Sequence, residues 1–419
     1  MIKIRNLNCG LRVAMEKITY VQSAAIGIWV KAGCVDEDDT NKGISHYIEH
    51  MMFKGTESRS PRQIAADIDK IGGQINAFTS KENTCYYVKT LSSNIDQACD
   101  VLLDMMLNSK FDAVEMEKEK NVVYEEIKMV EDSPEDDVQD CMVETLFKGT
   151  PLDRLILGTP ESLKQISRDD ILGYLKNQYS LNNIVVAVAG NFDEDAICEL
   201  FEGKLASLTS ASPASVFTPS IYVPQFKNKV KDIEQTHICL GTRAVKYGED
   251  DTFILSVLNN VIGGSMSSRL FQNIREEKGM AYSVYSFTTS YEHDGLFSIC
   301  AGVAHDKIEE TLHAIVDELD ILKKEGITEE ELETSKEQMK GSYIFSLEST
   351  SSRMVSIGKN TLMLNRNRTS EDVIRLIDSV TMDDILRISN LITDITTYSG
   401  ALISRRDLDL EMLIKKAVN

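Results

Sequence analysis

The chain has 419 residues, of which 42% are hydrophobic and 26% are charged. This length allows two or three domains with cores of their own, and this composition is typical of globular proteins rather than disordered or fibrous ones. The 45 Lys and Arg residues against 66 Asp and Glu residues give a net charge of −21, which argues against nucleic-acid partners and anionic membrane surfaces and favours basic peptides.

The cysteines and the N-terminal segment suggest a cellular location. The 8 cysteines are scattered and include no C-x-x-C pair, so we expect reduced core thiols and not a disulfide framework. The N-terminal segment has no apolar stretch of signal-peptide length and no Arg-rich amphipathic helix, and no apolar run is long enough to cross a bilayer. We therefore expect a cytoplasmic protein that does not enter the membrane.

The first half of the chain alternates apolar strands with amphipathic helices. Strands are expected at Ile2–Asn6, Leu11–Lys17, Ser23–Gly33, Gln74–Thr79, Thr84–Leu91 and Ile184–Gly190. Helices are expected at Gly43–Phe53, Pro61–Ile71, Asn94–Leu107, Asp112–Asp132, Arg168–Gln178 and Asp193–Leu205, with another from Pro134 to about Phe147.

A Ser-, Thr- and Pro-rich segment then separates two similar halves. The segment 207–225 contains three of the 7 prolines and reads as a linker. After it, the strand Gln235–Val245 repeats the place of Ser23–Gly33, and the Glu-rich helix 328–348 repeats the place of Asp112–Asp132. We therefore predict an α+β fold of two homologous domains, 1–206 and 226–419. Each would be a mixed, mainly antiparallel sheet covered by helices on one face.

The segment His46-Tyr47-Ile48-Glu49-His50 carries the strongest chemical signal. Its two histidines are four residues apart on a predicted helix, so both imidazoles can reach one metal ion, and Glu49 lies on the same side. Two imidazoles and a carboxylate suit Zn²⁺, and a carboxylate that is not a ligand can act as general base on an attacking water. The pattern is the inverted form of the H-E-x-x-H metalloprotease motif.

A catalytic zinc needs a third protein ligand, and the helix Asp112–Asp132 is its best source. Glu119 and Glu126 are seven residues apart on this helix, which is two turns along one face. Spacing alone does not choose among five candidates, and a solvated helix surface is the usual place for each of them. The candidates are Glu115, Glu117, Glu119, Glu125 and Glu126.

Four blocks of the sequence resemble the pitrilysin-type inverzincin zinc peptidases. This family includes insulin-degrading enzyme and mitochondrial processing peptidase, and the chain is most similar to the small bacterial relatives of the latter's beta subunit. The blocks run from His46 to Thr56, from Asn76 to Tyr87, from Glu119 to Ile127 and from Arg275 to Tyr282. They occur in the family's order, cover nearly the whole chain and show no departure at the metal or base positions.

The resemblance implies a zinc-dependent endopeptidase and assigns its central residues. It selects Glu126 as the third metal ligand beside His46 and His50. It implies that Glu119 helps to orient the ligands and that Glu49 is the general base, which takes a proton from water and returns it to the leaving amine.

The resemblance also implies a substrate-binding surface. Asn76 and the backbone of Ala77 would hold an extended peptide at a sheet edge, although an ordinary hairpin is the alternative. Phe53, three residues after His50, could line the substrate pocket or equally be a core residue. Tyr282 would donate a hydrogen bond to the oxyanion, and Arg275 would hold the substrate or the tyrosine.

The resemblance to processing peptidases further implies a homodimer that encloses a chamber. Whether Arg275 and Tyr282 serve their own chain or the partner stays open. The main alternative is a non-catalytic structural or assembly subunit, which the intact metal and base residues disfavour. A zinc hydrolase of small molecules is disfavoured by the two-domain length and the edge strand.

Overall fold

The computed structural model describes residues 2–206, 208 and 221–418, so most of the predicted linker 207–225 lies outside the described residues. The chain divides into two compact units. The described part of the first comprises 2–127, 154–206, 208 and 343–369, and that of the second comprises 128–153, 221–342 and 370–418. Each unit thus includes a segment from the other half of the sequence. The predicted domains, 1–206 and 226–419, do not contain this exchange.

The first unit is built on a six-stranded mixed sheet. In spatial order its strands are β1 (Ile2–Asn6), β2 (Arg12–Lys17), β6 (Ile184–Gly190), β3 (Ser23–Val30), β5 (Thr84–Leu91) and β4 (Gln74–Thr79). The pair β2 and β6 is parallel, and the other neighbours are antiparallel. The strand β4 therefore forms one edge of the sheet, as the family resemblance implies.

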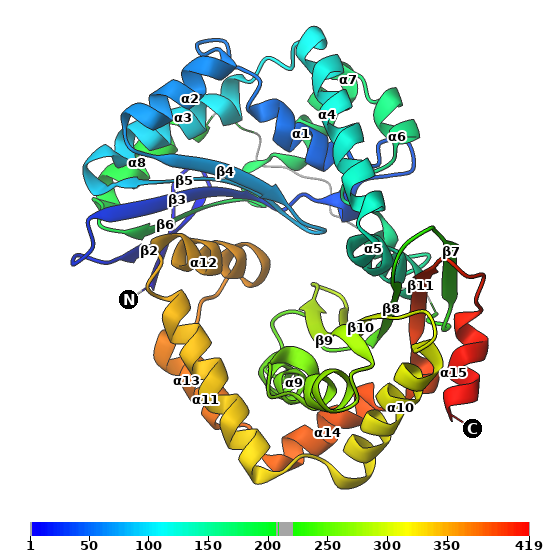
Figure 1. The fold of residues 1–419 in the computed structure, drawn as a ribbon. Coiled ribbons are helices and arrows are strands. Elements are labelled where there is room, and N and C mark those ends of the chain that lie inside the picture. The colour runs from blue at the N-terminus through cyan, green and yellow to red at the C-terminus, as the bar shows by residue number, and fades with distance from the viewer. Residues whose placement is uncertain (1, 207, 209–220, 419) are drawn as a thin grey trace. The chain divides into compact units, whose positions relative to one another are not determined.

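Helices cover one face of this sheet (Figure 1). They are α1 (Ile44–Met52), α2 (Pro61–Lys70), α3 (Ile95–Asn108), α4 (Ala113–Asp132), α6 (Pro160–Gln165), α7 (Arg168–Gln178) and α8 (Glu194–Leu205). Side chains alternate across a strand, and in β3 Ala24, Ile26 and Ile28 enter the core under these helices. The predicted α+β layering is confirmed.

A single helix from the second half of the sequence covers the opposite face. This helix, α12 (Thr350–Leu364), packs on β2, β3 and β6 and is drawn in orange below the sheet in Figure 1. Trp29 of β3 is fully buried in the small core on this side, together with Met354 of α12. A Cβ at Gly27 would lie 2.6 Å from the sulfur of Met354, so glycine at this position leaves room for the methionine of the covering helix.

The second unit repeats this plan with five strands. Their order is β7 (Phe226–Val230), β11 (Ser399–Ser404), β8 (Thr236–Arg243), β10 (Gly295–Val303) and β9 (Ala281–Ser290). Only β7 and β11 are parallel, so the pairing senses match those of β2, β6, β3, β5 and β4. Its helices are α9 (Asp251–Asn259), α10 (Ile308–Glu325), α13 (Ser370–Asp378), α14 (Met382–Ile392), α15 (Leu410–Val418) and most of α11 (Glu329–Ser346).

The exchange of one helix is also repeated. The helix α5 (Pro134–Leu146), from the first half, packs on β8 and β11. A Cβ at Gly241 would lie 2.5 Å from the sulfur of Met142, as one at Gly27 would press on Met354. The internal duplication predicted from element order therefore extends to individual glycine–methionine contacts.

The state of two cysteines differs from the sequence prediction. The prediction of reduced thiols is wrong for Cys239 and Cys300, which form a disulfide between directly paired positions of β8 and β10. The other six cysteines are free. Within the described residues, no helix is long and apolar enough to cross a membrane.

Candidate metal centre

The helix α1 presents its histidines beside a buried stripe. Ile44, Tyr47, Ile48 and Met51 follow helical spacing and are fully buried in the first unit's core. His46, Glu49 and His50 lie on the neighbouring stripe, and each is partly buried. The apolar stripe therefore fixes the direction in which the predicted metal ligands point.

A carboxylate from outside the helix caps its N-terminus. Gly43, the N-cap residue, has φ +88° and no side chain, so the first backbone N–H groups need another acceptor. Buried Glu37 supplies it: its Oε2 accepts from Gly43 N at 2.7 Å and its Oε1 accepts from Ser45 N at 2.9 Å. Ser45 Oγ also lies 2.8 Å from the hydroxyl of Tyr174. The turn that carries His46 is thus fixed from two sides.

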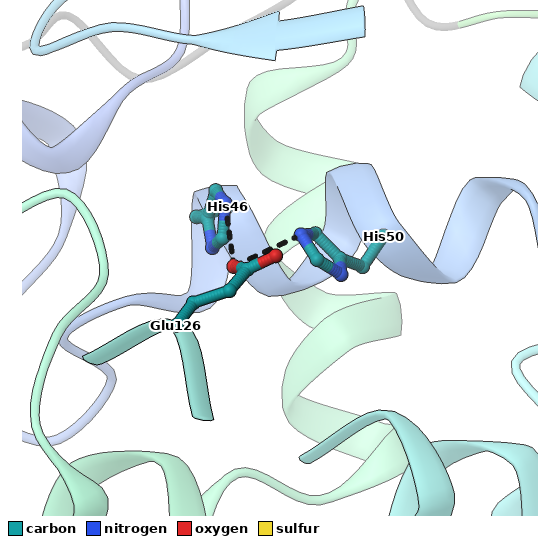
Figure 2. Close-up of side chains that lie close together, drawn as sticks. All are labelled: His46, His50 and Glu126. Atoms are coloured by element: carbon teal, nitrogen blue, oxygen red, sulfur yellow. Dashed lines mark ion pairs between the residues drawn. The ribbon is translucent and has the colours of Figure 1, made fainter. Parts of the chain in front are cut away.

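The helix α4 brings a carboxylate to the two imidazoles. The Tyr47 hydroxyl donates to the Met116 carbonyl at 2.6 Å, which joins the two helices. Glu126 Oε2 then lies 3.7 Å from His46 Nε2 and 3.5 Å from His50 Nε2 (Figure 2). One donor atom from each of the three residues can be chosen so that all lie within 4.8 Å of one another.

The geometry of this cluster fits a zinc ion. Bonds of about 2.0–2.2 Å in a tetrahedron separate neighbouring donor atoms by roughly 3.3–3.6 Å. The two nitrogen–oxygen distances of 3.5 and 3.7 Å are close to that range and too long for good hydrogen bonds. The three groups therefore face a common centre more than they bind one another. Of the five glutamates that spacing left open, the structure brings Glu126 to this centre.

The protonation of the two histidines differs. Burial, helped by the charge of the neighbouring His50, lowers the pKa of His46 to about 4, so His46 is neutral near pH 7. Burial would lower the pKa of His50 too, but its hydrogen bond to Glu119 and the nearby carboxylates outweigh burial and raise it. His50 Nδ1 lies 2.8 Å from Glu119 Oε1. This contact directs the Nε2 atom of His50 toward Glu126.

Glu49 is held beside the cluster by the edge strand. The Thr79 hydroxyl, at the end of β4, donates to Glu49 Oε2 at 2.5 Å. Burial raises the pKa of Glu49, and the hydrogen bond from Thr79 opposes that rise. A carboxylate with a raised pKa that is not among the clustered donors suits acid–base work.

The predicted substrate residues lie on the same unit. Asn76 is exposed on β4, and its side-chain oxygen accepts from the Ala77 N–H at 2.9 Å. A peptide that pairs with Ala77 through this N–H would have to displace that contact. Phe53 caps the end of α1 and packs, partly buried, against the core. The roles of these three residues stay predictions.

Arg275 and Tyr282 belong to the second unit. Tyr282, on β9, is 76% exposed, and the Arg275 guanidinium carbon lies 6.0 Å from the centre of its ring. The same guanidinium lies 4.7 Å from the Phe271 ring. The two side chains are therefore exposed and lie close together. Their contribution to catalysis stays a prediction.

Sequence reasoning missed three residues that support the centre: Glu37, Thr79 and Lys54. Thr79 and Lys54 lie inside the blocks that carry the family resemblance, so the blocks held a signal. Lys54 follows His50 by four residues and contacts Glu119. Glu37 precedes α1 in a loop, and no helical or strand periodicity points to it.

The chain matches two models of one peptidase family. "Insulinase (Peptidase family M16)" matches residues 12–160, and "Peptidase M16 inactive domain" matches residues 165–339. The relative "Uncharacterized zinc protease YmxG" of Bacillus subtilis is 43% identical over 406 residues, which cover 96% of this chain and 98% of the relative. An "Uncharacterized zinc protease" of Rickettsia felis is 35% identical and covers 97% of this chain and 98% of its own length.

Solved structures share the fold at lower identity. A protease from Helicobacter pylori has a TM-score of 0.89 and 23% identity, covering 96% of this chain and 99% of its own. A peptidase M16 inactive domain from Pseudomonas fluorescens has a TM-score of 0.91 and 17% identity, covering 98% of this chain and 99% of its own. The two family models and the bacterial relatives show that the chain belongs to the M16 (insulinase/pitrilysin) peptidase family.

Proposed function

We propose that this protein is a zinc-dependent endopeptidase that cleaves extended, unfolded peptides. The observation that carries the proposal is the convergence of His46, His50 and Glu126 on one centre, with Glu49 held next to it. The relatives' names as zinc proteases support the same reading.

In this proposal His46, His50 and Glu126 hold the zinc ion. Zinc would supply Lewis-acid polarisation of the scissile carbonyl and of the attacking water. Glu49 takes a proton from that water during attack and delivers it to the leaving amine. Its raised pKa makes it a stronger base toward that water than an ordinary carboxylate.

The substrate would lie along β4 as an added strand. This strand is a sheet edge, and its last residue contacts the base, so a peptide paired with β4 would pass close to Glu49. Asn76 and Ala77 would bind its backbone. Arg275 and Tyr282 are proposed to stabilise the oxyanion and to position the substrate. The net charge of −21 makes basic or leader-type peptides the first candidates.

The direct test is cleavage of a long, unstructured basic peptide by the purified protein, with the zinc content counted. The proposal expects cleavage by wild type and none by Glu49→Gln, with zinc in both. Glu161→Gln, an exposed change on α6, is the matched control and should cut like wild type. A wild type that binds no zinc would overturn the proposal.

The same experiment separates the alternative function. A wild type that binds zinc but cuts no peptide in the mixture would favour a structural or assembly subunit, or an enzyme that needs a second subunit. Cleavage of small zinc-hydrolase substrates but not of peptides would favour a zinc hydrolase that acts on small molecules. The homodimer and the cytoplasmic location also stay predictions from the sequence, and a monomeric mass in solution would contradict the first.

A further inference from the structure

A lysine lies behind the metal centre, on the far side of Glu119. Glu119 is 5% exposed, and its two oxygens have different partners. Oε1 lies 2.8 Å from His50 Nδ1, and Oε2 lies 2.6 Å from Lys54 Nζ. The side chains therefore form a chain from Lys54 through Glu119 to His50, whose other ring nitrogen faces Glu126.

The turn that carries Lys54 is held rigidly. Gly55 follows it with φ +104°, and its carbonyl accepts from Lys110 N at 3.1 Å. The next residue, Thr56, is fully buried and forms a β-bridge with Ser109 just after α3. These backbone contacts fix where the lysine side chain starts.

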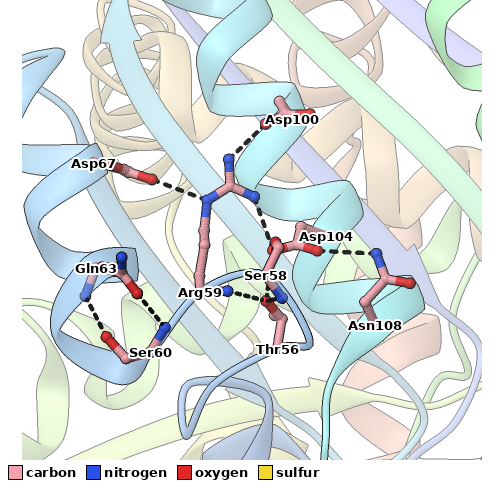
Figure 3. A network of polar contacts seen from close by, with 9 residues as sticks. All are labelled: Thr56, Ser58, Arg59, Ser60, Gln63, Asp67, Asp100, Asp104 and Asn108. Atoms are coloured by element: carbon pink, nitrogen blue, oxygen red, sulfur yellow. Dashed lines mark hydrogen bonds and ion pairs between the residues drawn. The ribbon is translucent and has the colours of Figure 1, made fainter.

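A buried carboxylate fastens the same turn to α3. Asp104 Oδ2 accepts from Thr56 Oγ1 at 2.6 Å, from Ser58 Oγ at 2.7 Å and from Arg59 at 2.8 Å (Figure 3). Arg59 also contacts Asp67 and Asp100. The turn is thus anchored to α2 and α3 through contacts that involve none of the proposed metal ligands.

We propose that Lys54 is a positioning residue of the zinc site, which acts through Glu119 on His50. The inference rests on the proposed zinc function. Lys54 occupies the second oxygen of Glu119, so the carboxylate is held with its first oxygen on His50 Nδ1. Fixed in this way, the imidazole keeps Nε2 directed at the metal position before the ion arrives.

Loss of the ammonium group would free this arrangement. Glu119 Oε2 would then be an almost buried charged atom without its cation, which favours rotation of the carboxylate or entry of water. The imidazole would lose its fixed orientation. Changes in groups that orient metal-bound histidines weaken metal binding by about 10–100-fold, and we expect the lower end because His50 keeps Glu119 itself.

The test is the zinc dissociation constant, measured by competition with a chromogenic chelator on the full-length protein. Lys54→Met should weaken zinc binding by about 10-fold, and Lys54→Arg should restore most of it. Lys118→Met is the matched control, because it removes the same charge from an exposed pair with Glu115 on α4. Its zinc affinity should equal that of wild type.

A double variant tests the route through Glu119. In a Glu119→Gln background, Lys54→Met should have little further effect on zinc affinity, because its partner is already gone. Equal effects in both backgrounds, or an unchanged affinity in Lys54→Met alone, would overturn the inference but leave the proposed function standing. An unfolded metal-free Lys54→Met would show a general structural role and also overturn it. A wild type that binds no zinc would overturn both.

Discussion

The Thr79 hydroxyl donates a hydrogen bond to Glu49 Oε2 at 2.5 Å. Thr79 is the last residue of the edge strand β4, and Glu49 lies on the metal helix α1. The bond joins the strand on which we expect the substrate to the group that we expect to move its proton. One contact therefore links the proposed substrate strand directly to the proposed base.

Replacement of Thr79 by valine should slow catalysis without loss of metal. Valine keeps the shape but not the hydroxyl, so we expect kcat to fall by about 10-fold, the equivalent of one hydrogen bond to a charged group. KM and zinc content should stay close to wild type, and Thr79→Ser should retain most of kcat. Steady-state kinetics on a fluorogenic peptide would measure this.

The control is Thr90→Val on β5. The Thr90 hydroxyl donates to the Ile71 carbonyl at 3.0 Å in the same unit, so its loss should lower stability but leave kcat unchanged. Equal losses of kcat in Thr79→Val and Thr79→Ser, or none in either, would contradict the role of the hydroxyl.

The buried cap Glu37 should make stability depend on pH. Burial raises the pKa of Glu37 to about 7 from an ordinary 4.5, although the N–H groups of Ser45 and Gly43 and the charge of Arg154 oppose the rise. Between these values the unfolded chain has lost the proton that the folded protein still holds. The free energy of unfolding should therefore fall as pH rises from about 4.5 to 7 and then level off, by on the order of 3 kcal/mol from this group.

The comparison with Glu37→Gln isolates this contribution. Glutamine does not titrate, so the difference in unfolding free energy between wild type and variant should decrease with rising pH across that window. Urea unfolding of the metal-free proteins from pH 4.5 to 8 would measure it. A difference that is flat or that grows with pH would show that the capping interactions keep Glu37 charged.

The three proposed metal ligands could be predicted from the sequence on different grounds. The pair His46 and His50 follows from helical spacing alone, because i and i+4 share a face. Glu126 does not, because its approach depends on how α4 packs against α1 through Tyr47 and Met116. Only the family resemblance selected it among five glutamates. Thr79, which contacts Glu49, and Lys54, which contacts Glu119, come from a strand end and a turn, where periodicity gives no direction.

For a similar reason, the sequence did not show which sheet each of the exchanged helices, α5 and α12, would cover. The helix α5 was expected but not its partner sheet, and α12 was not predicted at all. Both pack against strands from the other half of the sequence, so nothing local encodes the contact. Cys239 and Cys300 are 61 residues apart, and only the register of β8 and β10 brings them together.

The anchor Asp104 should contribute more stability than its exposed neighbour. Burial would raise its pKa, but hydrogen bonds from Thr56, Asn108, Ser58 and Arg59 outweigh burial and lower it to about 2. Asp104→Asn should therefore cost about 2–3 kcal/mol of unfolding free energy near pH 7, since buried donors lose a charged acceptor. Because the unfolded chain takes up this proton first, the difference from wild type should shrink as pH falls below about 4 toward 2.

The matched control is Asp100→Asn. Asp100 also contacts Arg59, at 2.6 Å, but its side chain is 58% exposed. An exposed ion pair contributes about 0–1 kcal/mol, so this variant should unfold close to wild type. Equal losses in the two variants, measured by urea unfolding, would show that Asp104 has no special place in the network of Figure 3.

Replacement of Gly358 on α12 by alanine should lower the stability of the protein, because this glycine lies against Trp29 of β3. In an open helix position, Gly→Ala stabilises by about 1 kcal/mol. At 358 a Cβ would lie 2.1 Å from Trp29 Nε1, and the indole is fully buried and packed edge-on against Phe78. We therefore expect Gly358→Ala to lower stability by about 1–3 kcal/mol through overpacking.

The matched control is Gly173→Ala on α7, where a Cβ meets nothing within 4 Å, and this variant should raise stability. Trp29 is the only tryptophan, so its fluorescence reports both unfolding and any shift of α12. An unchanged or raised stability in Gly358→Ala, with unchanged emission, would contradict a close contact between α12 and Trp29.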